Sequence, residues 1–189
     1  MRIGIIADSH IPTLAEEIPD QVKEAFISVD LILHAGDIQM ARALDWLETI
    51  APVYAATGNN DYFFEDPRMQ EVQIMEIEGF RIGMIHVFTY PERGGLSLDH
   101  YFKQKFKGPV DIIIYGDTHV PEVLFREGVL MINPGSPTSP GPNMYLGLGH
   151  VGILEIKDGK AQSWIVSIQD QQIYQPAFID NESWPDFLR

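Results

Sequence analysis

Short apolar runs rich in Ile, Val and Ala recur in the first third of the chain, and each stops abruptly at a polar cluster. The runs occupy residues 2–7, 31–35 and 53–57. Between them, apolar residues recur at helical spacing in residues 18–29 and 41–50. Strands that alternate with helices predict βαβ units and a parallel sheet, so the chain is expected to be an α/β protein.

The pattern changes after residue 61. Two pairs of apolar runs, at residues 72–87 and 146–168, each surround a short turn that contains Glu-Gly or Asp-Gly. These turns favour β-hairpins and bring antiparallel pairing into the fold. The other expected elements are a helix at 96–106 and strands at 110–115, 122–126 and 129–132.

The length of 189 residues predicts one domain, because a chain of this size buries most of its surface around a single core. We expect that domain to span residues 1–189, with residues 170–189 as a C-terminal tail packed on the body. The first ten residues are too short an apolar stretch for a signal peptide or a membrane span, which predicts a cytoplasmic protein without membrane contact. Homo-oligomerisation is left open.

Charge and cysteine content narrow the chemistry. The chain has 13 Lys and Arg against 27 Asp and Glu, a formal net charge of −14, which disfavours nucleic acid and anionic lipid as partners. It contains no Cys, which excludes disulfides, thiolate metal sites and thiol nucleophiles. Metal ligands would therefore have to be His, Asp, Glu or Asn.

Polar side chains of those types follow five of the predicted strands. In open α/β sheets the loops at the carboxyl ends of strands meet at one edge, where ligands bind. Taken singly, each Asp is more often a helix cap or turn residue and each His a satisfied buried side chain. Taken together, they predict a metal site. The residues are Asp8, His10, Asp37, Asn59, Asp61, His86, Asp117 and His119.

In this order the residues resemble the calcineurin-like metallophosphoesterases, and among them the compact single-domain phosphodiesterases of bacteria and archaea. The resemblance covers residues 1–156 and implies a four-layer α/β/β/α sandwich of two mixed β-sheets. Its motifs are D-x-H (Asp8-Ser9-His10), G-D (Gly36-Asp37), G-N-x-D (residues 58–61), the strand-end His86, G-x-x-H (residues 116–119) and N-P-G-S (residues 133–136).

The resemblance also implies two divalent metal ions bridged by Asp37, and a shared hydroxide that attacks phosphorus in line. The substrate would be a small phosphodiester or phosphoester. Mn²⁺ is the favoured metal, with Mg²⁺, Ni²⁺, Fe²⁺ and Zn²⁺ as alternatives. The implied ligands are Asp8, His10, Asp37 and His119 for the first ion, and Asp37, Asn59, His86 and Asp117 for the second.

The chain departs from the family pattern at two positions close to these ligands. Asp117 stands where the family has His, and its carboxylate favours Mn²⁺ over the softer Zn²⁺. Asn60 stands where many relatives have a His that protonates the leaving group, which an amide cannot do. Good leaving groups should therefore be preferred. His34 is a candidate substitute donor, with a structural role as the alternative, so the expected catalytic residues are Asp37, Asn59, Asn60 and His34.

Two further departures bear on the substrate pocket. Phe88 replaces a His and predicts a more apolar pocket wall, and Gly141 stands where many relatives carry an Arg that could clamp phosphate. Arg93 is either a replacement cation or a solvated loop residue. The main alternative to an enzyme is a protein-interaction module on the same fold. A nuclease is disfavoured because no basic stripe is present.

Overall fold

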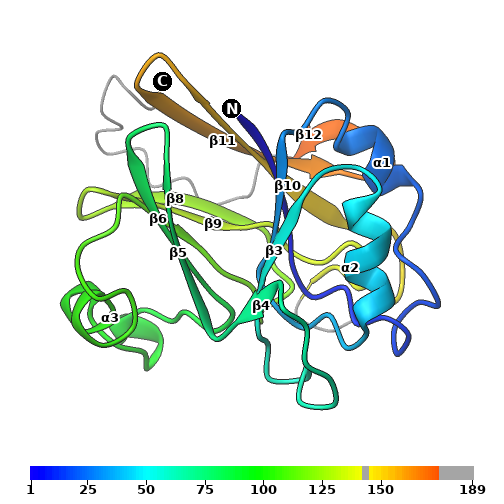
Figure 1. Cartoon of the computed structure of the whole chain (residues 1–189), viewed down its shortest axis with the longest axis horizontal. Helices are drawn as coiled ribbons and strands as arrows, with labels where there is room; N and C mark the ends of the chain where they lie inside the picture. The colour runs from blue at the N-terminus through cyan, green and yellow to red at the C-terminus, as the bar shows by residue number, and fades with distance from the viewer. Residues whose placement is uncertain (142–144, 175–189) are drawn as a thin grey trace.

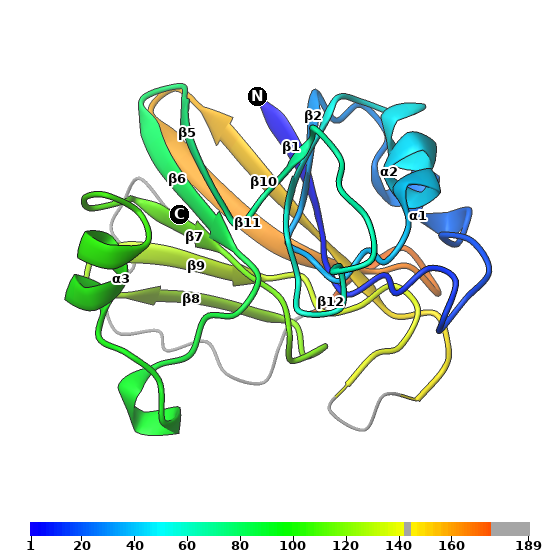
Figure 2. The same ribbon diagram turned by 60° about the horizontal axis from the view of Figure 1, so that its bottom comes forward.

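The computed structural model describes residues 1–141 and 145–174, which form two β-sheets flanked by helices (Figures 1 and 2). The larger sheet has the strand order β12-β11-β10-β1-β2-β3-β4. Its strands are β1 (Arg2–Ile6), β2 (Leu31–His34), β3 (Val53–Ala56), β4 (Met69–Gln70), β10 (His150–Lys157), β11 (Lys160–Ser167) and β12 (Gln172–Tyr174).

The smaller sheet has the order β5-β6-β7-β9-β8. Its strands are β5 (Val72–Ile77), β6 (Phe80–Ile85), β7 (Ile112–Ile114), β8 (Glu122–Arg126) and β9 (Val129–Asn133). The helices are α1 (Gln21–Ala25), α2 (Ala41–Glu48) and α3 (Leu98–Gln104), with one 3₁₀ turn, η1 (Pro91–Arg93).

Both sheets are mixed, as the resemblance implied. In the larger sheet β1 to β4 pair in parallel, whereas β10, β11 and β12 add antiparallel strands. In the smaller sheet β6, β7 and β9 are parallel and the outer strands β5 and β8 antiparallel. The predicted hairpins are β5–β6 and β10–β11.

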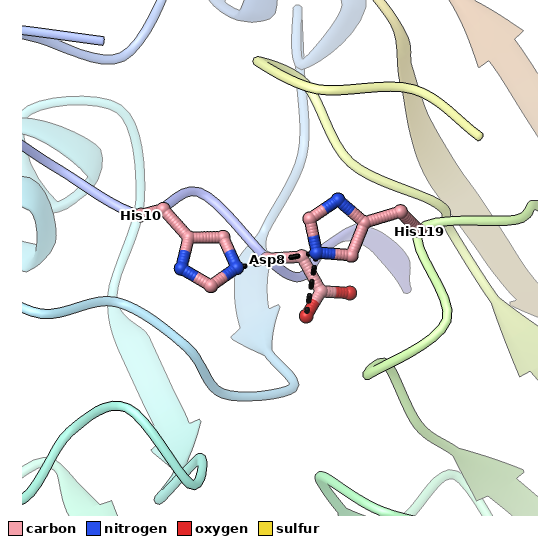
Figure 3. Close-up of side chains that lie close together, drawn as sticks. All are labelled: Asp8, His10 and His119. Carbon is pink, nitrogen blue, oxygen red and sulfur yellow. Dashed lines mark hydrogen bonds and ion pairs between the residues drawn. The ribbon is translucent and has the colours of Figure 1, made fainter. Parts of the chain in front are cut away.

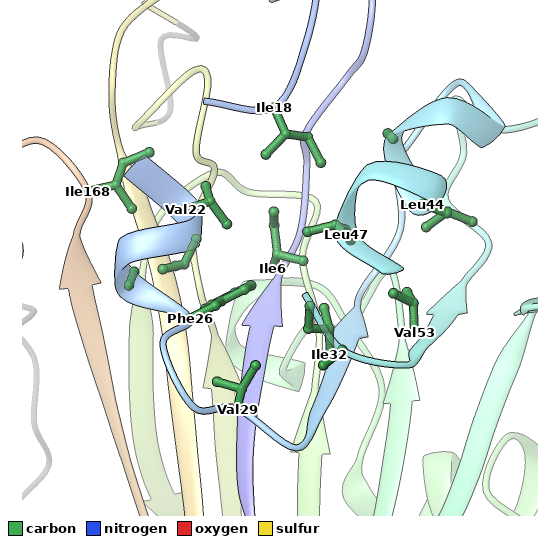
Figure 4. Close-up of a cluster of buried hydrophobic side chains, with 14 of the residues drawn as sticks. Ile6, Ile18, Val22, Phe26, Val29, Ile32, Leu44, Leu47, Val53 and Ile168 are labelled. Carbon is green, nitrogen blue, oxygen red and sulfur yellow. The ribbon is translucent and has the colours of Figure 1, made fainter. Parts of the chain in front are cut away.

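Three apolar clusters separate four layers. The central cluster joins the inner faces of the two sheets. A second lies between the larger sheet and helices α1 and α2 (Figure 4), and a third packs α3 on the outer face of the smaller sheet. The α/β/β/α sandwich is therefore confirmed, and Figure 2 shows α3 on the opposite side from α1 and α2.

Strand β1 shows how sequence alternation builds these layers. Ile3 and Ile5 face the cluster between the sheets, whereas Ile6 faces the helices, because successive side chains of a strand point to opposite sides. Gly4 shares the helix-facing side, where a Cβ would lie 3.0 Å from the ring of Phe26. The missing side chain lets Phe26 pack directly on the sheet.

The main differences from the predicted elements are at the edges. The first helix is much shorter than residues 18–29, because Ser28 adopts a left-handed conformation (φ 62°) that turns the chain after Phe26. The short edge strands β4 and β12 were not predicted. Strand β12 falls in the expected tail, whose residues 175–189 lie outside the described residues. Within the described residues, no helix is long and apolar enough to cross a membrane.

Candidate metal centre

Loops after β1, β2, β6 and β7 bring acidic and His side chains together at the carboxyl ends of strands from both sheets. Two groups have ligand atoms within 4.8 Å of one another. The first group is Asp8, His10 and His119 (Figure 3), and the second is Asp8, Asp37 and His86. All five side chains are buried. In the first group the Nε2 atoms of His10 and His119 face each other at 3.2 Å.

The carboxylate of Asp37, a member of the second group, also faces His10 of the first. Its Oδ1 is 3.4 Å from Nε2 of His86, and its Oδ2 is 3.5 Å from Nε2 of His10. Asn60 holds it in this orientation, since its backbone N–H donates to Oδ1 (2.8 Å) and its side-chain amide to Oδ2 (2.6 Å). One oxygen of Asp37 therefore faces each group.

Burial and mutual charge shift the titration of these residues. Burial raises the pKa of Asp8 to about 8, and the charge of Asp37 adds to the effect. Burial would also raise the pKa of Asp37, but the neighbouring imidazole of His86, together with the hydrogen bonds from Asn60, outweighs it and leaves that pKa below its ordinary value. Burial would lower the pKa of His86, but Asp37 and Asp8 raise it to about 9.

Backbone carbonyl groups hydrogen-bond Nδ1 of His86 and Nδ1 of His119 and so hold the orientation of both rings. Nδ1 of His86 lies 2.7 Å from the carbonyl oxygen of Ala35, and Nδ1 of His119 lies 2.8 Å from that of Ser139. Because a carbonyl only accepts, each Nδ1 must carry a proton and donate it. Nε2 is then the nitrogen that can bind a metal, and in both rings it faces the ligand groups.

The side-chain amide of Gln39 lies against Nδ1 of His10, as the backbone carbonyls lie against Nδ1 of the other two histidines. Its amide nitrogen is 3.0 Å from Nδ1 of His10, while its Oε1 is buried without a hydrogen-bond partner. Rotating the amide by 180° places Oε1 against Nδ1–H and satisfies that oxygen. His10 then matches His86 and His119. No motif pointed to Gln39, because its role depends on a loop conformation that the sequence does not display.

Two buried atoms within the second group also lack partners. Nε2 of His86 and Oδ2 of Asp8 make no hydrogen bond, although polar atoms buried this deeply are normally satisfied. Both point to a region lined by carboxylate oxygens and imidazole nitrogens, the donors that divalent transition metals accept. The residues present therefore fit the divalent cations that the sequence predicted.

Asp61 holds the loops rather than facing the ligand groups. Its carboxylate accepts hydrogen bonds from the backbone N–H groups of Asp37 (3.0 Å), Ile38 (2.7 Å), Gln39 (2.7 Å) and Gly58 (2.7 Å). A single side chain thus ties the loop after β2 to the loop after β3, which fixes the backbone that carries Asp37.

The N-P-G-S segment supports the loops from the other sheet. Asn133 donates from its side chain to the carbonyl of Gly116 (2.9 Å) and to Thr118 (3.1 Å). The hydroxyl of Ser136 donates to the carbonyl of Asp8 (2.8 Å). These bonds join the first and last ligand-bearing loops, so the segment positions the site without lining it.

Motif glycines are needed where loops approach closely. A Cβ on Gly36 would lie 2.6 Å from Nδ1 of His86, and one on Gly58 would lie 2.2 Å from the backbone nitrogen of Asp37. Neither contact can be relieved by moving a flexible side-chain end. Any larger residue would push the ligand-bearing loops apart.

The backbone at the ligands is strained. Five of them adopt the left-handed conformation that non-glycine residues generally avoid. Their φ angles are 54° for Asp8, 48° for His10, 59° for Asp37, 70° for Asp117 and 58° for His119. The strain turns each side chain toward the same region, as is typical of functional sites.

Two predicted ligands lie at the rim. The side chain of Asp117 is 41% exposed, with Oδ1 3.9 Å from Nε2 of His86, and its backbone N–H donates to Asp8 (3.2 Å). Asn59 is exposed, and Asn60 rather than Asn59 contacts Asp37. The turn that Asp61 closes points residue 60 inward, an outcome that the G-N-x-D motif alone did not reveal.

His34 is placed differently from its predicted catalytic role. It is fully buried, with Nε2 2.9 Å from the Ser9 hydroxyl and Nδ1 accepting from the backbone N–H of Gly36 (3.2 Å). Burial lowers its pKa to about 3. A neutral ring engaged at both nitrogens holds two loops together, and this geometry favours the structural alternative.

Of the three residues discussed for the substrate pocket, Phe88 is the one whose prediction was wrong. Phe88 does not form a pocket wall: it is buried among the rings of Tyr90, Tyr101 and Tyr115 beneath α3. Arg93 is 62% exposed and pairs with Glu122 at 3.3 Å, as a solvated loop residue would. The backbone N–H of Gly141 donates to the carbonyl of His119 at 3.0 Å.

A sandwich with buried Asp and His side chains that converge at the strand ends fits a metal-dependent phosphoesterase, the class that the sequence resemblance implied. Residues 1–159 match the sequence model of the calcineurin-like phosphoesterase superfamily domain. A probable metallophosphoesterase of Methanothermobacter thermautotrophicus is 45% identical over 142 residues, which cover 74% of this chain and 79% of the relative. The chain belongs to the calcineurin-like phosphoesterase superfamily and is a compact metallophosphoesterase.

Solved structures show the same fold. Wild-type Vps29 of Entamoeba histolytica complexed with Zn²⁺ is 25% identical with a TM-score of 0.72, covering 92% of this chain and 96% of that one. A structure described as a novel archaeal phosphodiesterase has a TM-score of 0.63 at 23% identity, covering 88% of this chain and 100% of its own.

Proposed function

We propose that the chain is a phosphodiesterase that uses two divalent cations, Mn²⁺ by preference, to hydrolyse small phosphodiesters. The observation that carries the proposal is the carboxylate of Asp37, which presents one oxygen to His10 and the other to His86. This orientation suits a ligand shared by two ions. When bound, the ions would activate a water molecule and neutralise the phosphoryl oxygens.

The side chains have distinct parts in this proposal. Asp8, His10, Asp37 and His119 would hold the first cation. Asp37 and His86 would hold the second, with Asn59 and Asp117 completing its coordination from the rim. Asn60 fixes both oxygens of Asp37 but has no proton to give to a leaving group. Esters whose leaving groups depart as stable anions are therefore the expected substrates.

The direct test is an assay of metal-stripped protein on bis(p-nitrophenyl) phosphate with Mn²⁺, Mg²⁺, Ni²⁺ or Zn²⁺ restored singly, alongside EDTA. Turnover should need added metal and should be lost in Asp37→Asn. Asp20→Asn is the matched control, since the Asp20 side chain is 87% exposed on the surface. Absence of turnover with every metal would overturn the proposal.

Asp117 supplies the argument for the metal preference. A carboxylate oxygen in place of imidazole favours Mn²⁺ over Zn²⁺, and it makes the site one charge more negative than a neutral His ligand would. Asp117→His should move the ranking toward Zn²⁺ in competition binding. An unchanged ranking would contradict the assignment of Asp117 as a ligand.

A protein-interaction module is the second candidate. The similarity to Vps29 supports it, and so do Tyr62 and Phe63, which follow Asp61 and are 72% and 80% exposed with ring centroids 4.1 Å apart. The assay above separates the two candidates, because an interaction module needs no metal-dependent turnover. A cytoplasmic location and homo-oligomerisation stay predictions.

A further inference from the structure

A pocket of about 460 Å³ opens beside the second ligand group. His86 and Asn59 are among its lining residues, so a molecule in the pocket would lie beside the candidate ligands. Its size is within the ordinary range for sites that bind small organic groups. Asp37 and His10 are not among its lining residues, which places the pocket to one side of the ligands.

The wall of the pocket is apolar. Val87 and Leu96 project into it while 43% and 44% exposed, and buried Ile85 and Tyr101 form further wall. The hydroxyl of Tyr101 is occupied, since it accepts a hydrogen bond from the backbone N–H of Thr89 (3.2 Å). Exposed apolar side chains around a concave surface favour an apolar ligand.

The charge at the rim is neutralised. Apart from His86 at the candidate ligands, the cation among the described residues that line the pocket is Lys105, and its Nζ lies 2.6 Å from Oε1 of Glu71. This pairing offers little attraction to a second phosphate or carboxylate on the ligand. The additional phosphates of a nucleotide would have to compete with Glu71 for Lys105. An uncharged group can bind beside the ion pair without disrupting it.

We propose that this pocket binds an uncharged aromatic or similarly bulky apolar ester group of the substrate while its phosphoryl group lies at the metal ligands. The inference rests on the proposed function, because it assumes that a phosphoryl group binds beside His86. Leu96 and Val87 are then specificity-determining residues. They select the ester group and take no part in the chemistry.

The test measures binding of phenylphosphonate and methylphosphonate to the Mn²⁺-loaded protein by calorimetry. The two probes share a head group and differ in the apolar group. Phenylphosphonate should bind about 10-fold or more tightly, the discrimination typical of an apolar pocket. Leu96→Asp should remove most of that difference and leave methylphosphonate affinity nearly unchanged. Ile27→Asp, at an equally apolar but distant site that is 66% exposed, is the matched control.

A second variant addresses the rim. Glu71→Gln leaves Lys105 without its partner, so 3-carboxyphenylphosphonate should gain affinity relative to phenylphosphonate. Circular dichroism and melting curves verify that each variant is folded, and Val87→Gly provides an uncharged alternative to Leu96→Asp that should lower the phenyl preference.

The outcomes separate this inference from the proposed function. Equal binding of both phosphonates, or a phenyl preference that survives both Leu96→Asp and Val87→Gly, would overturn the pocket assignment while metal-dependent turnover stands. If neither phosphonate binds and no metal supports turnover, the proposed function fails, and the pocket assignment fails with it.

Discussion

The two ligand groups share Asp8 but differ in how completely the protein encloses them. In the first group, Asp8, His10 and His119 are 0%, 4% and 4% exposed. In the second group Asp8, Asp37 and His86 are also buried. The two side chains proposed to complete its coordination, Asn59 and Asp117, are instead exposed at the rim. If two cations bind as proposed, the first would enter a site that the described side chains already enclose, and the second would lie beside the pocket, at the more open group.

Replacing Asp37, whose two oxygens face His10 and His86, should have the largest effect. Asp37→Asn would take a charged ligand from both of the proposed cations, and kcat should fall by about 10³-fold or more, since metal stabilisation of the transition state is worth several kcal/mol. Metal analysis by mass spectrometry should show fewer ions per chain. A variant that keeps both ions and normal turnover would refute the bridging position of Asp37.

Removing one candidate ligand from each group should change the affinities of the two proposed metal sites independently. His119→Ala should weaken the tighter site by about 100-fold or more, because loss of a supporting partner alone costs 10–100-fold. Asp117→Ala should weaken only the looser site. Calorimetric titration of metal-stripped protein measures both phases. If Asp117→Ala instead abolished the tighter phase, the contrast between the preformed and the open group would be wrong.

Gln39 tests how the first group is held. Gln39→Leu removes the acceptor for Nδ1–H of His10 and should weaken the tighter site by about 10–100-fold. Gln39→Glu keeps an acceptor and should largely restore affinity. If the Gln39 side-chain amide instead donates a hydrogen bond to Nδ1 of His10, Gln39→Glu should weaken metal affinity at least as much as Gln39→Leu. Melting curves of the metal-free variants separate a change in stability from a change in affinity.

The pH dependence of metal binding probes two of the same side chains without any substitution. Raised pKa values mean that the metal-free fold keeps protons on Asp8, to about pH 8, and on His86, to about pH 9. A cation must displace them, so affinity should rise with pH by roughly 10-fold per unit for each proton released and level off near pH 9. Titrations in buffers of different ionisation enthalpy count those protons. Affinity that is flat from pH 6.5 to 9 would contradict this.

Much of the site could be predicted because strand ends are visible in sequence. Asp8, His10, His86 and His119 each follow an apolar run, and parallel strands bring such ends to one edge. The sequence does not show which residue of a turn points inward. A small change in the turn conformation would direct the side chain of Asn59 instead of Asn60 toward Asp37.

Other features depended on tertiary packing. The sequence placed Phe88 after a ligand and suggested a pocket wall, whereas the aromatic cluster under α3 takes the side chain into the core. His34 lies at the end of a strand like the candidate ligands, but its two ring nitrogens contact the Ser9 hydroxyl and the backbone N–H of Gly36. Strands β4 and β12 contain two and three residues, too few for any periodicity to show.

The left-handed backbone at Asp8, His10, Asp37, Asp117 and His119 has a consequence for engineering. Each position costs about 1 kcal/mol relative to a residue without a Cβ, so glycine would relieve it. A selection for heat resistance alone, with no demand for metal, would therefore accept glycine at these five positions among the first. Thermostable variants of this chain should be screened for retained metal, because the substitutions that relieve backbone strain here are the ones that erase the site.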